Sequence, residues 1–235
     1  MGSQGEMNID SLNMEPDAGG VIHKATDALR ADISAGRLPP GEKLKVAWVR
    51  QTYDISAASA REALSQLCGE GYVDAIEQRG FFVSDMTSEV LLDNTRLRAE
   101  LESLAFRWSV AHQTPEWRAG IVSSHFLLKE AEAAMLDNPA RAIRTWDDRN
   151  RAFHMSLIAN AESPALIDLV RDRYDMTRRF RIHAYLRITD SDALRQRLQH
   201  SAADHEQIAQ AALALDADKG AELLWAHINK PSGAS

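Results

Sequence analysis

The sequence predicts a mainly α-helical fold: an N-terminal winged helix-turn-helix followed by a C-terminal bundle made of helices alone. Residues 21–84 carry three helical patterns and then two short β patterns. Residues 89–230 carry helical patterns only. With 235 residues, 45% of them hydrophobic and 26% charged, the chain is long and apolar enough for two domains with cores of their own.

The ends of the chain and its composition narrow the class of protein. Residues 1–20 are rich in Gly, Ser, Asn and acidic residues without apolar periodicity, so we expect a disordered lead. The single cysteine, Cys68, excludes an intrachain disulfide and favours a reducing compartment. No apolar run approaches the roughly 18 residues of a membrane span. We therefore expect a soluble, cytoplasmic protein without a membrane partner.

The first two expected helices cover residues 21–34 and 46–53. Apolar residues recur at helical spacing in the first of them, and the Gly- and Pro-rich turn at 36–44 cannot continue it. A third helix follows the turn at 54–56 and ends at Gly71.

The third helix has an apolar stripe on one side, formed by Ala60, Ala63, Leu64, Leu67 and Cys68. Its N-terminus has two candidate caps: Ser59, which forms a capping-box pattern with Glu62, and Ser56. The segments YVDAI and FFVSD then flank EQRG, which predicts two short strands around a tight turn. Three helices and a hairpin in this order predict a winged helix-turn-helix.

The side of the third helix opposite the stripe carries one arginine, Arg61, among the small residues Ala57, Ala58 and Ser65. A helix-turn-helix places the N-terminal end of its second helix in the major groove of DNA. Small residues let the backbone approach closely, and one arginine can then bind guanine or a phosphate with two hydrogen bonds. The alternative is that Arg61 is an ordinary surface residue.

Net charge gives no support for nucleic-acid binding. The formal net charge is −7, and basic and acidic residues balance from Gly20 to Ser84. Binding to DNA would therefore depend on where the cations are placed and on dimerisation, which doubles the number of DNA contacts, because there is no overall basic field.

The C-terminal part is expected to form six helices, with breaks at Thr114–Pro115, Asn138–Pro139, Ser163–Pro164 and near Thr189–Asp190. Their expected spans are 91–111, 121–136, 139–161, 164–186, 193–215 and 217–229. No β pattern occurs there, so an all-helical bundle is predicted.

Three histidines of the bundle form a candidate metal site. Asn150 and His154 are spaced i, i+4 and share one helix face, while His205 and His227 belong to two later helices. Three imidazoles and one oxygen donor can hold Zn²⁺, Ni²⁺ or a similar divalent ion. The alternative is that each is an ordinary core or surface histidine.

Three segments of the first part resemble the GntR family of bacterial transcription regulators: ISAGRLPPGEKL, YDISAASAREALSQLCGEGYV and RGFFV. The resemblance implies a DNA-binding role for six residues. They are Lys43, Ser56, Ser59, Arg61, Arg79 and Gly80. The family often has an arginine where this chain has Ala57 and a proline where it has Ser59.

The second part is similar to the FadR-type C-terminal ligand-binding (FCD) domain of that family. His154, His205 and His227 match its three histidine positions, and Asn150 stands where the family usually has aspartate. The resemblance implies a bound divalent metal, and the neutral asparagine implies weaker binding than aspartate would give.

Arginines of the second part are candidates for effector binding. By the resemblance, Arg98 faces the cavity and pairs with an effector carboxylate; the alternative is a salt bridge to Glu102 on the same helix. The run Arg178–Arg181 offers further cations, and we interpret Arg178 as part of a solvated face.

These features favour a ligand-responsive bacterial transcription regulator, most simply a repressor. A homodimer would bind a double-stranded DNA operator, and a small carboxylic acid at or near the metal would change the spacing of its DNA-binding modules.

The first alternative is a helical metal-dependent hydrolase with an appended winged helix. That reading lacks a placed general base, because Glu206 follows His205 directly and points about 100° away around the helix. A third hypothesis is a partner-binding protein that uses the winged domain for protein contacts. We therefore expect that the protein is not an enzyme.

Overall fold

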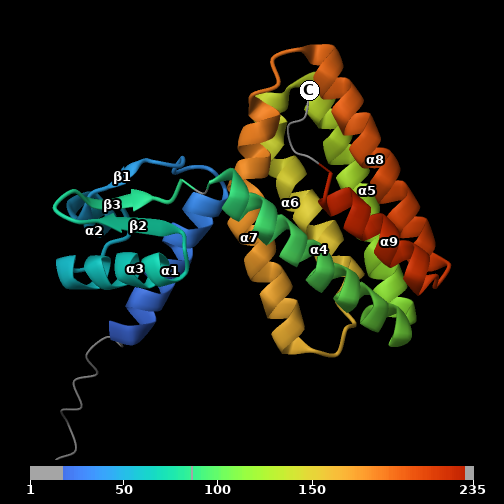
Figure 1. Ribbon diagram of the computed structural model, residues 1–235, viewed down its shortest axis with the longest axis horizontal. Helices are drawn as coiled ribbons and strands as arrows, with labels where there is room; N and C mark the ends of the chain where they lie inside the picture. The colour runs from blue at the N-terminus through green and yellow to red at the C-terminus, as the bar shows by residue number, and fades with distance from the viewer. Residues whose placement is uncertain (1–17, 86, 231–235) are drawn as a thin grey trace, which may run out of the picture. The chain divides into compact units, whose positions relative to one another are not determined.

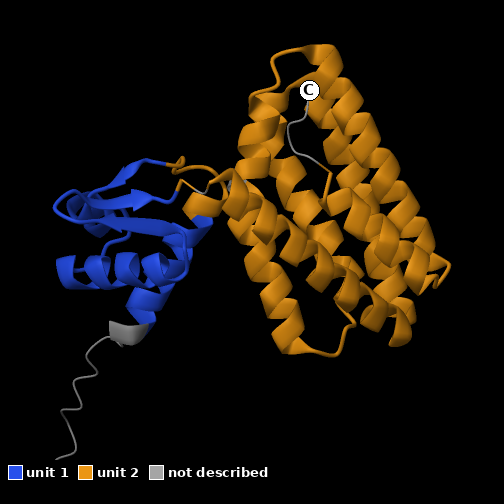
Figure 2. Ribbon diagram, in the orientation of Figure 1, with its two compact units in different colours: residues 1–31, 41–84 blue, residues 32–40, 85–235 orange. Residues whose placement is uncertain are grey.

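The computed structural model describes residues 18–85 and 87–230. The chain divides into two compact units, coloured separately in Figure 2. Unit 1 comprises residues 1–31 and 41–84, and unit 2 comprises residues 32–40 and 85–235. Most of the predicted disordered lead, residues 1–17, lies outside the described residues, whereas its last three residues form the start of the first helix.

Unit 1 has the helices and the hairpin that the sequence predicts, together with one additional strand (Figure 1). The sheet order is β1-β3-β2, and both pairings are antiparallel, with Lys43 opposite Phe82 and Val73 opposite Val83. The additional strand β1 has only two residues, too few to show an alternating pattern in the sequence. The elements are α1 (Ala18–Ser34), β1 (Lys43–Leu44), α2 (Val46–Thr52), α3 (Ala57–Gly69), β2 (Val73–Ile76) and β3 (Gly80–Val83).

Helix α3 is fixed at its N-terminus by a hydroxyl cap and on its inner side by apolar contacts. Ser56 is the cap, because its Oγ accepts a hydrogen bond from the Ser59 backbone N–H at 3.0 Å. The alternative cap, Ser59, is wrong because it lies inside the helix. The buried residues of α3 are Ala60, Ala63, Leu64 and Leu67, while Cys68 is only half-buried. The predicted apolar stripe is thus confirmed, apart from full burial of Cys68.

Unit 2 is a closed ring of six helices (Figure 1). Neighbours in the ring pack in the order α4, α7, α6, α5, α8, α9 and back to α4. The elements are α4 (Ser88–Ala111), α5 (Pro115–Asp137), α6 (Pro139–Leu157), α7 (Pro164–Leu186), α8 (Ser191–Leu213) and α9 (Ala217–Ile228). An all-helical second part is therefore confirmed.

Three helices of unit 2 begin with a polar cap followed by proline at the first helical position. Thr114, Asn138 and Ser163 each accept a hydrogen bond from the backbone N–H three residues later. The predicted start of this helix at Ile121 is six residues too late, because helix α5 starts at Pro115. Trp117 is the only buried residue in the stretch before Ile121. Apolar periodicity alone could not reveal this first turn.

The interior of unit 2 is a single apolar core. Its largest fully buried side chains are Phe106, Ile121, Leu128, Trp146, Phe153 and Tyr174. None of the helices in the described part of the chain combines the length and apolarity that crossing a membrane requires.

We expect Gly220→Ala to destabilise unit 2. A Cβ at Gly220 would lie 2.4 Å from ring atoms of the fully buried Phe106. Such overpacking costs up to about 3 kcal/mol, more than the roughly 1 kcal/mol that alanine gains over glycine in helix propensity. Urea unfolding followed by circular dichroism measures the change. The control is Gly120→Ala in α5, where a Cβ meets nothing within 4 Å, so that we expect a gain of up to about 1 kcal/mol. Equal stability of the two variants would contradict this account.

Candidate metal centre and candidate DNA-binding surface

Three imidazoles meet inside the ring of unit 2. His154 from α6, His205 from α8 and His227 from α9 each offer a ring nitrogen, and these atoms lie within 4.8 Å of one another. His154 and His205 are buried and His227 is half-buried. Three residues from three helices, separated by 51 and 22 positions along the chain, thus form one cluster.

Each imidazole of this cluster contacts a carboxylate through its Nδ1 atom. Because an ionised carboxylate only accepts hydrogen bonds, each Nδ1 carries the proton, and each Nε2 keeps a free lone pair. The pairs are His154 with Glu102, His205 with Glu132 (2.9 Å) and His227 with Asp204 (3.1 Å).

The Nε2 atoms of His205 and His227 lie 3.1 Å apart. With both protons on Nδ1, two lone pairs face each other at this distance, an arrangement that repels unless a proton or a cation lies between them. Two imidazole nitrogens bound to one ion at about 2.0–2.1 Å are themselves about 3.0–3.4 Å apart. The cluster therefore has the donor set and the Nε2 separation that suit a divalent ion.

Burial keeps two of the imidazoles neutral, those of His154 and His227. Desolvation lowers the pKa of His154 to about 4, against the raising effect of Glu102. Desolvation and then the nearby His205 lower the pKa of His227 to about 3. Neutral imidazole is the form that binds metal ions, so no proton has to leave these rings near pH 7.

Arg98 lies beside the cluster and pairs with Glu102 on the same helix, at 2.8 Å between Nε and Oε2, with both side chains buried. The salt bridge that the sequence offered as an alternative is therefore present. Burial alone would raise the pKa of Glu102, but the charge of Arg98 and the hydrogen bonds from Arg98 and His154 outweigh it and lower this pKa to about 2. The Arg98 guanidinium also lies 4.2 Å from the centre of the Tyr174 ring. It is both a structural partner and a cation at the centre.

Asn150 is buried one turn before His154 on α6. Its Nδ2 donates a hydrogen bond to the Tyr174 hydroxyl at 2.7 Å, and burial raises the pKa of this tyrosine to about 12. Tyr174 therefore stays protonated and orients the Asn150 amide.

Arg178 and Arg181 are both held by the buried carboxylate of Asp147. Arg178 pairs with Asp147 and Asp148, and Arg181 lies 2.7 Å from Asp147. The side chain of Arg178 is only 13% exposed, so the interpretation of it as part of a solvated face is wrong. The periodicity of the run did not reveal this, because the partners lie on α6, some 30 residues earlier.

The outward side of α3 is open to solvent. Ala58, Arg61 and Ser65 are exposed and Ala57 is half-buried. Within the described parts of the chain, no hydrogen bond or ion pair holds the Arg61 guanidinium. A free arginine on a backbone lined by small side chains is available to a ligand that approaches this helix.

Two cations of the wing lie close to one aromatic ring, that of Phe82 on β3. Lys43 and Arg79 lie 5.6 and 5.5 Å from the centre of the Phe82 ring. Gly80 has a φ of +95°, which a residue with a side chain rarely adopts, so the tight turn after Arg79 requires glycine. The wing thus presents two positive charges, one from β1 and one from the β2–β3 turn, close to the same ring.

Each of the two parts of the chain matches a known protein family. Residues 22–83 match the bacterial regulatory proteins of the gntR family, and residues 93–230 match the FCD domain. The chain belongs to the GntR family. It is a transcription regulator with a GntR helix-turn-helix and an FCD domain.

Two similar proteins are named as regulators of transcription. The chain is 30% identical over 203 residues to the HTH-type transcriptional repressor GlaR of Escherichia coli, covering 86% of this chain and 90% of GlaR. It is 33% identical over 208 residues to the HTH-type transcriptional regulator BphR of Paraburkholderia xenovorans, covering 88% and 82%. These relatives are named as regulators of transcription, which confirms that this GntR protein is not an enzyme.

A solved structure shares the fold. Escherichia coli McbR/YncC superposes with a TM-score of 0.71 at 20% identity, covering 88% of this chain and 93% of that one. At this level of identity the likeness shows the fold alone.

The sequence did not reveal three supporting residues of the centre: Glu132, Tyr174 and Asp204. Glu132 and Tyr174 lie on helices that carry none of the three histidines. Asp204 precedes His205 directly but supports His227, a pairing that sequence adjacency would have misassigned. Their only sequence signal is a polar residue at a position where the helix faces the core.

Proposed function

We propose that this protein is a dimeric repressor of the bacterial cytoplasm that binds a palindromic operator and is released by a small carboxylic acid. One observation carries the proposal. A GntR helix-turn-helix with an unpaired Arg61 and an FCD domain with three converging imidazoles occur on the same chain. The repressor assignment draws on GlaR, which is 30% identical and is named a repressor.

The DNA-binding half of the proposal rests on the exposed cations of unit 1. Arg61 reads base edges in the major groove, where the small side chains of α3 allow close approach. Ser56 and Ser59 lie at the N-terminus of the same helix, where hydroxyls and backbone N–H groups suit phosphate oxygens. Lys43 and Arg79 contact the DNA backbone from the wing, and Gly80 shapes the turn that directly follows Arg79.

Arg61→Ala should weaken operator binding at least about fivefold, because a bidentate arginine–guanine contact contributes about 1–3 kcal/mol. The operator is first selected from random-sequence DNA with the wild-type protein, and affinity is then measured by fluorescence anisotropy at fixed salt. Lys24→Ala, an exposed charge on α1, is the matched control and should leave the affinity unchanged.

Lys43→Ala provides the comparison for a backbone contact. It should weaken binding to operator and to random DNA alike, because a phosphate contact is independent of sequence. If Arg61→Ala binds the operator as tightly as the wild type, α3 does not read the DNA.

The sensing half rests on the cluster of unit 2. His154, His205 and His227 would hold a divalent ion such as Zn²⁺ or Ni²⁺, with the Asn150 oxygen as a fourth donor. Such an ion, when bound, supplies an open coordination position for a carboxylate oxygen.

The wild type dialysed against Zn²⁺ or Ni²⁺ should retain about one ion per chain and melt at a higher temperature, since an ion bound only to the folded state stabilises it. His205→Ala should lose both effects, and His200→Ala, an exposed histidine on the same helix, should keep them. Asn150→Asp should bind the ion more tightly, because it restores a negative charge. Elemental analysis and calorimetry measure the stoichiometry and affinity. Retention of the ion by His205→Ala would show that it binds elsewhere.

The effector is a small carboxylic acid that reaches the centre beside Arg98. The guanidinium uses Nε for Glu102 and has further N–H donors, one of which lies 3.3 Å from His154 Nδ1. A coupling of about 1–3 kcal/mol between acid binding and DNA binding is enough for a useful response.

A panel of small mono-, di- and tricarboxylic acids should contain at least one that releases operator DNA from the zinc-loaded wild type. Arg98→Lys should require about tenfold more of that acid, because lysine keeps the charge but loses the bidentate geometry. Operator affinity without acid is the internal control for both proteins. An unchanged acid response in Arg98→Lys would exclude this arginine from effector binding.

A further inference from the structure

The amide of Asn150 is buried with only one of its two ends paired. Its Nδ2 donates a hydrogen bond to the Tyr174 hydroxyl at 2.7 Å, and the residue is only 4% exposed. Among residues 18–85 and 87–230, no hydrogen bond reaches its Oδ1. Buried acceptors in proteins are normally paired, because burying an unpaired one costs free energy. A buried oxygen without a donor therefore indicates a ligand that would use its lone pairs, and a cation is such a ligand.

This amide belongs to the surroundings of the imidazole cluster. Asn150 lies one turn before His154 on α6, so the two side chains share a face of the helix. The ring of Tyr174 also packs near the ring of His154, with the two centres 5.6 Å apart. The residue that binds the Asn150 nitrogen is thus itself a neighbour of the candidate metal ligands.

We propose that Asp147, Arg181 and Tyr174 form a positioning chain that offers the oxygen of Asn150, rather than its nitrogen, to an ion held by the three imidazoles. The inference rests on the proposed function, because it assumes that unit 2 binds a divalent ion. It goes beyond that function by assigning a role to a buried charge pair on α6 and α7 that binds neither the ion nor the acid.

An amide needs positioning in a way that a carboxylate does not. The two oxygens of an aspartate are equivalent, whereas an amide has one oxygen and one NH₂ group, and only the oxygen can bind a cation. Without an ion, the free Nε2 lone pairs of the cluster would attract the NH₂ group of Asn150 and turn its oxygen away. A hydroxyl can serve either end of an amide, and here it accepts from Nδ2. The NH₂ group is thereby withdrawn from the imidazoles.

The ring of Tyr174 is held on its faces by cations. It is fully buried, and the guanidinium groups of Arg98 and Arg181 lie 4.2 and 4.5 Å from its centre. Arg181 is fixed in turn by Asp147, whose Oδ1 accepts hydrogen bonds from Nε at 3.1 Å and from Nη2 at 2.7 Å. Each contact restricts the next one, so the position of the hydroxyl depends on the charge pair behind it.

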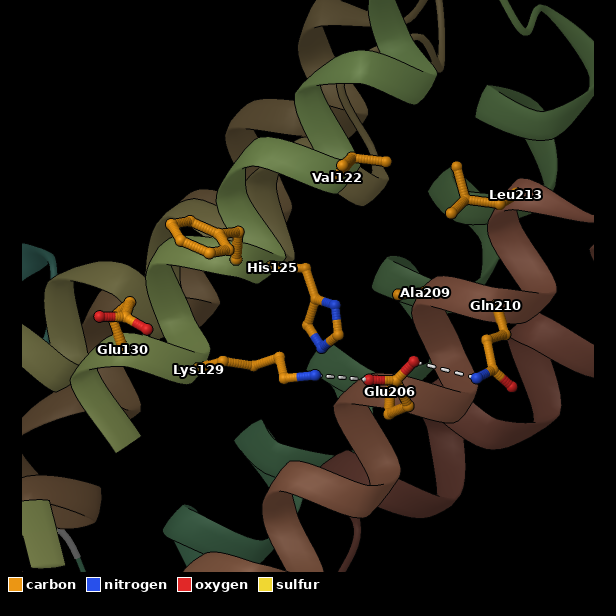
Figure 3. Close-up of a pocket in the computed structure, with 9 residues that line it drawn as sticks. Val122, His125, Lys129, Glu130, Glu206, Ala209, Gln210 and Leu213 are labelled. Carbon is orange, nitrogen blue, oxygen red and sulfur yellow. Dashed lines mark hydrogen bonds and ion pairs between the residues drawn. The ribbon is translucent and has the colours of Figure 1, made fainter. Parts of the chain in front are cut away.

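Two charged side chains of the groove between α5 and α8 are, by contrast, paired with each other (Figure 3). Lys129 and Glu206 lie 3.1 Å apart, and Glu206 also accepts a hydrogen bond from Gln210 at 2.9 Å. The groove has a volume of about 380 Å³ and is lined by His125 as well. Among the described residues, however, the imidazole cluster is the only group of three histidine, cysteine or acidic side chains close enough to hold one ion.

Calorimetric titration of the full-length protein with Zn²⁺ tests the role of the hydroxyl. Tyr174→Phe keeps the ring and should raise the dissociation constant of Zn²⁺ at least about tenfold, as the loss of a group that orients a metal ligand commonly does. Tyr185→Phe is the matched control, because Tyr185 is a buried tyrosine of the same helix whose hydroxyl has no hydrogen bond within the described part of the chain. It should leave the constant unchanged.

The Asn150→Asp background separates orientation from packing. In that background Tyr174→Phe should change the Zn²⁺ constant by no more than about threefold, because either carboxylate oxygen can face the ion. A tyrosine that only packs would weaken Zn²⁺ binding equally in both backgrounds. Urea unfolding of the ion-free proteins shows whether each variant folds. Asn150→Ala keeps the test decisive if Tyr174→Phe does not fold, since it removes the oxygen itself and should weaken binding by at least about tenfold.

Arg181→Lys tests the outer part of the chain. Lysine keeps a charge for Asp147 but loses the planar group that lies on the ring, so Zn²⁺ binding should weaken by about threefold. In the Tyr174→Phe background the same substitution should have no further effect, because the hydroxyl that it positions is already gone.

The outcomes separate this proposal from the function on which it rests. A wild type that binds no Zn²⁺, or binds it as well after His205→Ala, would overturn the proposed ion site. A wild type that binds Zn²⁺ at the cluster, but is unaffected by Asn150→Ala or loses affinity equally with Tyr174→Phe in both backgrounds, would overturn only the positioning chain. Additive effects of Arg181→Lys and Tyr174→Phe would remove Arg181 and Asp147 from it.

Discussion

The arrangement of unit 2 depends on three imidazoles whose ring nitrogens lie within 4.8 Å of one another. Burial keeps His154 and His227 neutral, and a carboxylate at each Nδ1 fixes which nitrogen faces the centre. Every helix of the ring contributes a side chain to this arrangement or to its support, in chain order Glu102, Glu132, His154, Tyr174, His205 and His227. The centre therefore exists only when the whole ring has closed, and anything that binds at it acts on all six helices together.

Selection for stability alone would not favour the charged residues in the interior of unit 2. Asp147, Arg181, Arg98 and Glu102 are charged residues held inside or at the edge of an apolar core, and each had to be removed from water. Apolar side chains of similar volume are often as stable as buried ion pairs or more stable. Under the proposed function, the polar groups around the three imidazoles serve to recognise an ion and an acidic ligand.

The sequence predicted the fold well where local chemistry controls it. Polar caps followed by proline at 139 and 164 mark the helix starts, and the spacing of Asn150 and His154 places both on one face. It failed where structure depends on pairing across the fold. Strand β1 exists because two residues meet β3, and Arg178 is buried because Asp147 lies opposite it on α6. Glu132 and Tyr174 could not be found either, because an isolated polar residue in a helix does not indicate which helix it will face.

Helix α5 connects the centre to the outer surface of unit 2. On its inner side Glu132 holds His205, and on its outer side Lys129 pairs with Glu206, the residue that follows His205 on α8. One turn away, the His125 ring packs on Phe153, whose ring also contacts His205. A ligand that shifts His205 must therefore strain contacts on both sides of α5, because packed interiors transmit small displacements rather than absorb them. In the proposed dimer, such a strain in unit 2 changes the angle between two copies of the chain. Operator half-sites lie about one helical turn of DNA apart, so a small change of angle at the dimer axis is enough to misplace one recognition helix.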